Sequence, residues 1–477
     1  MVRVTWDSLL LLLLAATDML VSPPGPGGPL CHTAVSVLCH TWLASCLHHF
    51  PSPTMWRTFQ SVAVNWRHRM ETILHWSSVC QALLSKQLLF LYDSTFPRYN
   101  EDSCCTNLNL SFSNEVLAQL YIRFLHILGN IVEISQRDII CDSPGLFQAG
   151  LKTREVMACL DLLPDIFCKA MTVGSKLVNG YLGISSSTIS SSTSSSTSAT
   201  LPSKRPRCNT LLHMFGSWLF QAALLDTEFS GFKHHNNATK CYCAGRAVAL
   251  ETLCIIFNSK RYGESIEDAY IARFYLAIKK GLEADIDVKC SIMKSFNNIM
   301  SKDLPGINII VPSLIETLQG FAEGTMSEES IKQDVVMFRK CLLTVTKTLL
   351  PLTHHFDTQV PAALINSEKA QSVKLGQLRE NLVLTLQHNL QADKDLENCQ
   401  KLLGMMAIFI CHELLEIQHS DDGTNYDNSD NLKSWSTSLL NLFCYKLISS
   451  WTHDLATCLT ACEVISYVAT SGVKLGR

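Results

Sequence analysis

Hydrophobic residues recur at the spacing of an α-helix throughout residues 245–318. The first helix of this stretch is expected to bury one stripe of side chains, Leu250, Leu253, Cys254 and Phe257. Polar breaks separate three more helices, whose apolar positions are Ile266, Ala269, Tyr270, Phe274, Ala277 and Ile278, then Val288, Ile292, Phe296 and Ile299, then Pro312 to Leu318. A helix cannot cover its own stripe, so each must stack on its neighbours. This pattern predicts an α-solenoid of helix pairs of roughly 40 residues, nearest the HEAT or armadillo period.

The same spacing continues on both sides of this stretch, and no convincing strand pattern occurs anywhere in the chain. The predicted fold class is therefore all-α. A low-complexity segment from Ser185 to Ser198, almost wholly Ser and Thr, cannot bury enough apolar surface to order itself. The sequence predicts three regions: helical repeats over 1–184, a disordered Ser/Thr-rich linker over 185–208, and further helical repeats over 209–477.

The predicted linker ends in a basic cluster, Lys204 to Arg207. Solvated charge at the end of a linker is the favoured interpretation. A nuclear import signal and a tether regulated by phosphorylation are the alternatives.

An apolar run from Leu9 to Ala16 follows Arg3, as in a short secretory signal. However, Asp7 precedes the run, Asp18 closes it, and no cleavage site of the Ala-x-Ala kind follows. The run is also too short to span a bilayer. A buried first helix is favoured over a signal peptide, and no membrane span is expected.

Composition changes this picture little. Charged residues make up 17% of the 477 residues, below the ~25% of an ordinary soluble domain. Such a composition suits a large helical core, or a surface kept apolar for a partner. The net charge of −3 gives no reason to expect a nucleic acid or an acidic membrane surface as the partner.

The chain contains 20 cysteines, scattered over predicted helix faces rather than grouped in a disulfide framework. Free cysteines that pack as small hydrophobic residues are therefore expected, and a cytoplasmic location is favoured. His234, His235, Cys241 and Cys243 form the one plausible metal-ligand group, but their spacing does not match that of structural zinc sites. An incidental cluster is favoured over zinc, so no metal and no cofactor is expected.

Motifs for catalysis are lacking: the sequence has no phosphate-binding glycine loop, zinc-protease motif, nucleophile elbow or kinase signature. The pairs His48–His49 and His354–His355 are expected to end helices and cap carbonyl groups. Glu413 and Glu416 are expected on a solvated helix face. No catalytic residue is nominated, and the chain is not expected to be an enzyme.

Short motifs along the chain resemble, in the same order, the beta-subunit family of Ral GTPase-activating proteins. They are Phe50-Pro51-Ser52-Pro53, Trp56-Arg57, Asn65-Trp66-Arg67-His68, Arg123-Phe124-Leu125-His126, Phe215-Gly216-Ser217-Trp218-Leu219-Phe220, Ala244-Gly245-Arg246-Ala247, Arg273-Phe274-Tyr275, Leu304-Pro305-Gly306-Ile307 and Leu349-Leu350-Pro351-Leu352-Thr353-His354-His355-Phe356. Each motif alone is weak, but their common order covers nearly the whole chain.

The resemblance implies a non-catalytic subunit. In that family the beta subunit pairs with a catalytic alpha subunit, and the pair accelerates GTP hydrolysis by Ral-type small GTPases. The catalytic asparagine belongs to a domain of the alpha subunit that nothing in this sequence matches. We therefore expect a helical-repeat scaffold that supports a catalytic alpha subunit and meets the GTPase only indirectly. The alternative is a self-standing helical-repeat adaptor for protein–protein interaction.

Overall fold

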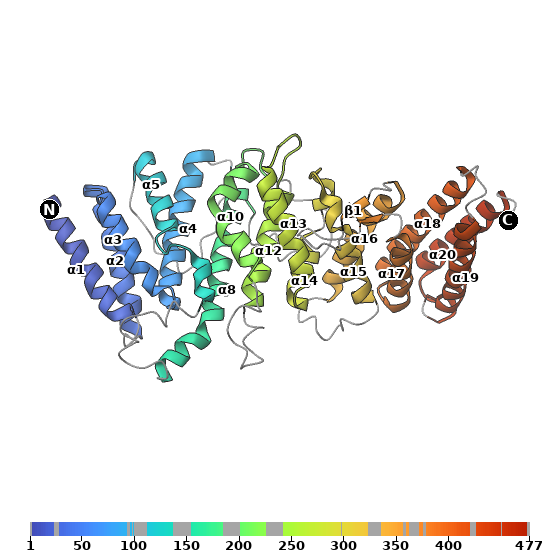
Figure 1. Cartoon of the computed structure of the whole chain (residues 1–477), viewed down its shortest axis with the longest axis horizontal. Helices are drawn as coiled ribbons and strands as arrows, with labels where there is room; N and C mark the ends of the chain where they lie inside the picture. Colours follow the sequence, from blue (N-terminus) through green and yellow to red (C-terminus); the bar gives the residue numbers. More distant parts are fainter. Residues whose placement is uncertain are drawn as a thin grey trace. The chain divides into compact units, whose positions relative to one another are not determined.

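In a computed structural model of the whole chain, the described residues are 2–22, 28–92, 96–97, 99, 112–136, 154–184, 201–225, 242–296, 298–322, 335–355, 359–361, 372–374, 378–419, 426–449 and 451–474. They form two compact units, Met1–Ala277 (unit 1) and Ile278–Arg477 (unit 2). The helical-repeat class predicted from the sequence is confirmed in both units, as Figure 1 shows.

Unit 1 is a stack of helices in two layers. Its helices are α1 (Arg3–Val21), α2 (Pro29–His48), α3 (Pro53–Ala63), α4 (Met70–Tyr92), α5 (Asn114–Leu125), α8 (Arg154–Leu182), α10 (Cys208–Ala223), α12 (Cys243–Asn258) and the first part of α13 (Asp268–Leu282), with the 3-10 turns η1 (Val64–Trp66) and η2 (Ile131–Ser135). One layer runs α2, α4, α8 and α12, each helix packed on the next. The elements α5, η2 and α10 cover this layer from the other side.

Unit 2 repeats the same arrangement. Its elements are α14 (Ile286–Ser295), η3 (Ile299–Ser301), η4 (Ile307–Ile310), α15 (Val311–Ala322), α16 (Val335–His355), α17 (Arg379–Ala392), α18 (Leu396–His419), α19 (Tyr426–Ser449) and α20 (Leu455–Lys474). Helices α14, α16, α18 and α20 pack in sequence as one layer, and α15 packs on α17 in the other. Packing between alternate helices is what a HEAT-like repeat produces.

The hydrophobic stripes of residues 245–318 are buried as predicted. All four stripe residues of α12 are fully buried, and so are Val288, Ile292 and Phe296 at α14. Two details differ from the prediction. Ala269 lies on the exposed side of α13, and α14 ends at Ser295, so that Ile299 reaches the core from η3.

Local sequence explains the sharp corner between α2 and α3. Helix α2 ends at His48, and Pro51 and Pro53 prevent its continuation because proline lacks a backbone N–H donor. Pro53 then occupies the first turn of α3, where no donor is needed. The Ser52 hydroxyl accepts a hydrogen bond from the Met55 backbone N–H at 3.3 Å and so caps the new helix.

The predicted three-region division stays a prediction, because residues 185–200 of the linker lie outside the described residues. Helix α8, which precedes the linker, packs extensively on α12, which follows α10. The boundary between the compact units follows Ala277, inside α13.

Two short strands were not expected from the sequence. Strand β1 (Gln359–Pro361) pairs antiparallel with β2 (Ser372–Lys374), with Val360 opposite Val373. Each strand has only three residues, so alternation of polar and apolar positions is too brief to indicate it.

Helix α1 belongs to the core of unit 1 through one face. Leu10, Leu14, Thr17 and Val21 are buried, and Asp18 accepts a hydrogen bond from the Trp66 indole N–H at 2.9 Å. By length and composition alone, both α1 and α2 could also cross a membrane, a test that N-terminal signal sequences and core helices of soluble proteins pass as well.

The closest approach between α8 and α12 occurs at Gly245. A Cβ atom at this position would lie 2.5 Å from Cε1 of Phe167 and 3.3 Å from the Cys168 Cα. Phe167 is fully buried, so its ring cannot move aside without disturbing the core. Only glycine permits the two backbones to come this close.

We expect Gly245→Ala to lower the free energy of unfolding by about 1–3 kcal/mol, because the added methyl group overpacks the α8–α12 contact. Gly174→Ala in α8 is the matched control, since a Cβ there would meet no atom within 4 Å. That control should raise stability by roughly 0.5–1 kcal/mol through helix propensity. Urea unfolding followed by circular dichroism measures both; equal effects of the two variants would contradict the close-contact explanation.

Candidate interaction surface

The residues considered for chemistry do not assemble into a site in the described part of the chain. No group of three or more His, Cys, Asp or Glu residues that could hold a metal ion occurs there. His234, His235 and Cys241 lie outside the described residues, while Cys243 is buried at the start of α12. The other histidine pairs do end helices: His48 is the last residue of α2 and His355 the last of α16.

The described cysteines are free thiols, most of them buried. Burial raises the pKa of Cys39 and of Cys46 to about 12, which removes the thiolate that reactivity or metal binding requires. Cys254 shows the same direction of shift from the same cause. These thiols pack as small hydrophobic side chains.

The expectation that Glu413 lies on a solvated helix face is wrong. Its side chain is buried in α18, and its carboxylate forms an ion pair with Arg379 of α17, with 3.6 Å between Nη1 and Oε1. The spacing in the sequence could not reveal this, because α18 is covered by α16 and α17 as well as by α20. The side chain of Glu416 lies outside the described residues.

The basic cluster after the linker is also less solvated than expected. Arg205 donates hydrogen bonds from Nη1 to the Pro202 carbonyl and from Nη2 to the Ser259 carbonyl, both at 2.9 Å. Arg261 in turn donates to the Arg205 carbonyl. Arg205 therefore satisfies a carbonyl group at the C-terminal end of α12, while Lys204 and Arg207 stay exposed. A role in nuclear import would require this segment to detach from α12.

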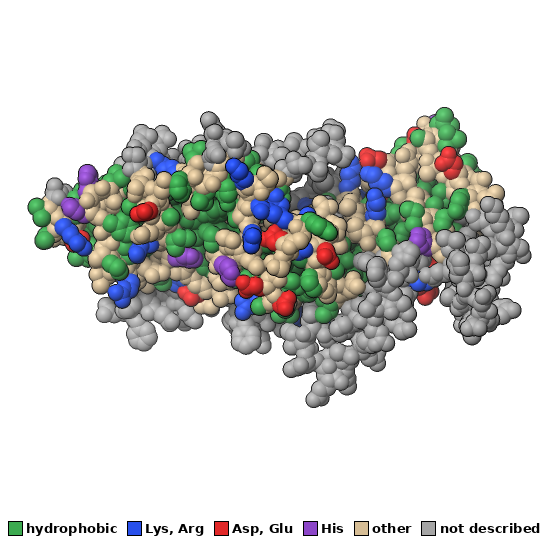
Figure 2. Space-filling model, turned by 90° about the horizontal axis from the view of Figure 1, so that it is seen from above, with side chains coloured by type: hydrophobic (Ala, Val, Ile, Leu, Met, Phe, Trp, Pro, Cys, Tyr) green, Lys and Arg blue, Asp and Glu red, His purple; other side chains and the backbone are tan. Residues whose placement is uncertain are grey.

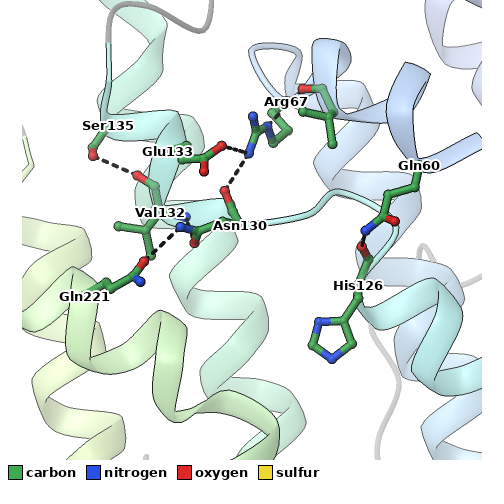
Figure 3. A network of polar contacts seen from close by, with 9 residues as sticks. Gln60, Arg67, His126, Asn130, Val132, Glu133, Ser135 and Gln221 are labelled. Carbon is green, nitrogen blue, oxygen red and sulfur yellow. Dashed lines mark hydrogen bonds and ion pairs between the residues drawn. The ribbon is translucent and has the colours of Figure 1, made fainter. Parts of the chain in front are cut away.

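A part-buried polar network around Arg67 joins three parts of unit 1 (Figure 3). Nη1 of Arg67 lies 2.6 Å from the Asn130 carbonyl and 2.6 Å from the Glu133 carboxylate. The Asn130 side-chain amide donates to Gln221 of α10 at 2.8 Å. On the neighbouring turn, Gln60 of α3 donates to the His126 carbonyl at 2.9 Å. These bonds hold the connection between α5 and η2 against α3 and α10, so the network stabilises the stack.

Exposed large apolar side chains are more frequent on the early and late helices of the described chain than on those between. Before α8 they are Val2, Val4, Leu11, Leu12, Met19, Leu30, Val37, Leu47, Leu74, Leu89, Phe90, Leu91 and Ile122, and after α16 they are Leu384, Leu396, Ile408, Leu440, Tyr445, Ile448, Leu455, Leu459 and Tyr467. From α8 to α16, the described side chains include only Leu162 and Tyr262 as large exposed apolar groups.

We call the apolar side of α1 that faces away from α2 and α3 the open face. It carries Val4, Leu11, Leu12, Ala15, Ala16 and Met19, all exposed. Figure 2 shows hydrophobic side chains interspersed with basic, acidic and histidine side chains over the visible face, in the region of α1 as elsewhere. The open face is the candidate interaction surface of unit 1, since an apolar area of this kind marks a contact with another molecule.

Comparison with known proteins places these observations in a family context. Residues 1–94 match the family described as the RALGAPB N-terminal domain. The chain is 28% identical to the Ral GTPase-activating protein subunit beta of Homo sapiens and 27% identical to that of Mus musculus, in each case over 85% of its own length. A Rap-GAP domain-containing protein of Dictyostelium discoideum is 24% identical over 69% of the chain. The resemblance inferred from the motifs is confirmed.

The chain spans about a third of the length of the mammalian relatives, 35% in each case, and 16% of the Dictyostelium protein. No solved structure matches the chain. The motifs that carry the resemblance are largely structural here: Trp66, Arg67 and His68 are buried.

We expect Arg67→Met to lower the free energy of unfolding by about 2–4 kcal/mol, because the Val64 and Asn130 carbonyls would lose a charged donor in the core. Glu133→Gln is the control. Its side chain is 42% exposed and the amide can still accept a hydrogen bond, so its effect should stay below about 1 kcal/mol. Urea unfolding of both variants tests this; an Arg67 variant as stable as the unsubstituted chain would show that the network adds nothing.

We also expect acid to destabilise unit 1. His68 is buried, and burial, assisted by the charge of Arg69, lowers its pKa to about 3. Burial also lowers the pKa of His75, to about 4. Below pH ~6.5 the unfolded chain binds protons that the folded chain cannot, so stability falls by about 1.4 kcal/mol per pH unit for each such histidine.

The measurement is the urea midpoint between pH 7.5 and 4.5. His68→Asn keeps a short donor toward the Asn65 carbonyl, which the imidazole contacts at 2.9 Å, but cannot titrate. The His68→Asn variant should therefore lose less stability on acidification than the unsubstituted chain. His213→Asn, at a side chain that is 58% exposed, is the control and should lose as much stability as the unsubstituted chain. An unchanged pH profile in the His68 variant would exclude this histidine as a source of the acid sensitivity.

Proposed function

We propose that this chain acts as a non-catalytic helical-repeat subunit of a GTPase-activating complex for Ral-type small GTPases. In this proposal it supports a catalytic alpha subunit in the cytoplasm. The observation that carries the proposal is the similarity to the Ral GTPase-activating protein subunit beta over 85% of the chain. Abundant free thiols suit a reducing compartment.

The chemistry of GTP hydrolysis explains why a scaffold role is the better proposal. A GTPase-activating protein must hold a side chain rigidly at the transferring phosphoryl group, to orient water or neutralise developing charge. The described residues supply buried thiols, buried histidines and stacked helices rather than a group of polar side chains directed to one point. Helical stacks are well suited to holding another protein along an extended surface.

The distribution of apolar groups suggests how a partner is held. Large apolar side chains are exposed on α1 and α2, at the end of α4 and on α18 to α20, and the described part of α10 to α16 exposes few of them. A partner that packs on these exposed apolar side chains would remove them from water. Support of the alpha subunit would then consist of stabilising its fold or its recruitment, without contact with the nucleotide.

Single-turnover GTP hydrolysis by a Ral-type GTPase tests the proposal. The purified chain alone should leave the intrinsic rate unchanged. A mixture with a catalytic alpha subunit should show binding, together with greater activity or a longer half-life of activity than the alpha subunit alone.

Two results would contradict the proposal. Acceleration by the chain alone would show that it carries catalytic groups. Absence of both binding and effect in the mixture would favour a self-standing adaptor. As a control, Gly174→Ala, which leaves the surface unchanged, should behave as the unsubstituted chain in every arm.

A further inference from the structure

Two half-buried arginine side chains, Arg205 and Arg261, lie next to each other at the C-terminal end of α12, and we call them the arginine pair. Arg205 donates to the Ser259 carbonyl at 2.9 Å, and Nη2 of Arg261 donates to the Arg205 carbonyl. Burial lowers the pKa of Arg205, and the nearby charge of Arg261 lowers it further. Two like charges are thus held close together away from bulk water, which is unfavourable unless an anion compensates them.

No carboxylate of the described chain is paired with these two side chains. Neither guanidinium group forms an ion pair with a described residue, and the Nε atom of each is buried without a hydrogen-bond partner there. Glu264 is the acidic residue whose charge acts on Arg205. However, both of its carboxylate oxygens accept from backbone N–H groups, Oε1 from Cys208 at 2.7 Å and Oε2 from Arg261 at 3.0 Å. This carboxylate is therefore committed to the start of α10 and to the turn after α12.

The arginine pair has hydrogen-bond donors left over. An arginine side chain carries five N–H donors in a planar fork. Arg261 uses Nη2 on the Arg205 carbonyl, and its Nη1 has no partner among the described residues. Arg205 uses one N–H of Nη1 on the Pro202 carbonyl and one of Nη2 on the Ser259 carbonyl, and each nitrogen keeps a second N–H. Such forks match the oxygens of a phosphate group, which accepts parallel hydrogen bonds from a guanidinium.

Further positive charge flanks the pair. Lys204 and Arg207, which precede and follow Arg205 in the sequence, are exposed, and Lys260 lies directly before Arg261. These two short segments together carry five cationic residues, although the net charge of the chain is −3. A local excess of positive charge on a chain that is acidic overall attracts an anionic ligand to this place.

We propose that the arginine pair binds the phosphate group of a phosphorylated serine or threonine in a segment of another protein. Such a group carries about −1.5 to −2 charges at pH 7 and three acceptor oxygens, so one phosphate can compensate both arginines. Tyr262 follows Arg261 in a turn closed by a 3.1 Å hydrogen bond from the Glu264 N–H to the Arg261 carbonyl, and its side chain is fully exposed. Its ring offers a contact for the peptide residues beside the phosphate.

An anionic membrane surface fits this place less well. Glu267 and Asp268 follow the same turn and are exposed, so a flat layer of anionic headgroups would repel them. A single phosphate group at the arginine pair does not have to meet these two carboxylates. The inference is independent of the proposed function, since it involves neither a GTPase nor the exposed apolar side chains.

The experiment is fluorescence anisotropy of the full chain with a labelled Gly-Gly-Ser-Gly-Gly peptide at low ionic strength, with the serine either phosphorylated or unmodified. The phosphorylated peptide should bind at least about tenfold more tightly. Arg261→Gln should weaken that binding by at least about tenfold, because it removes the fork with the open Nη1. Arg57→Gln, which removes an exposed cation of α3, is the matched control and should change the affinity by less than about twofold.

A second variant and a second measurement guard against a loss of folding. Arg261→Lys keeps the charge but not the planar fork, so it should fold as the unsubstituted chain does in urea unfolding and still bind the phosphorylated peptide more weakly. Bound phosphorylated peptide should also slow amide hydrogen exchange in residues 201–207 and 259–264 of the unsubstituted chain, and leave exchange in α1 unchanged.

Three results would overturn the proposal. The first is equal affinity for the phosphorylated and the unmodified peptide. The second is an equal loss of affinity in the Arg261→Gln and Arg57→Gln variants, which would indicate unspecific attraction by positive charge. The third is sedimentation of the chain with phosphatidylcholine vesicles that contain a phosphoinositide, abolished by Arg261→Gln, without binding of the phosphorylated peptide. That result would assign the arginine pair to a membrane surface.

Discussion

The structure depends on one constraint: none of its helices can bury its own hydrophobic stripe. The contact between α8 and α12 shows how this constraint is met. Gly245 lets the two backbones approach until Phe167 fills the remaining space, and this contact joins chain segments on both sides of the Ser/Thr-rich region. Stacking also places polar groups between the layers, away from water. These groups must therefore find hydrogen-bond partners inside the stack.

The buried polar groups illustrate that consequence. Arg67 donates hydrogen bonds to the Val64 and Asn130 backbone carbonyls. Arg246 does the same at the end of α10, where its Nε donates to the Ala223 carbonyl at 2.8 Å. Arg205 serves the end of α12. In each case an arginine side chain donates to a backbone carbonyl, so the basic residues of this acidic chain are partly structural.

The sequence predicted the burial of side chains correctly where apolar residues recur at helical spacing. It did not predict burial that depends on residues distant in the chain. Leu250 and Val288 are buried as their spacing predicted, because a stripe needs only its own helix to be recognised. Glu413 was misjudged, since its environment is set by Arg379 on another helix. The sequence predicted the candidate surface only in part. The unbroken apolar run from Leu9 to Ala16 indicated a buried helix, but it did not indicate that only one side of this helix is covered.

Several residues of the motifs that resemble the family serve the core. Trp66, Arg67 and His68 are buried, and so is Arg246. A surface that holds a partner leaves little trace in such residues. The open face of α1 and the exposed side chains of α19 and α20 are apolar although nothing within the described chain requires it. Their exposure is therefore more informative about binding than the buried core motifs are.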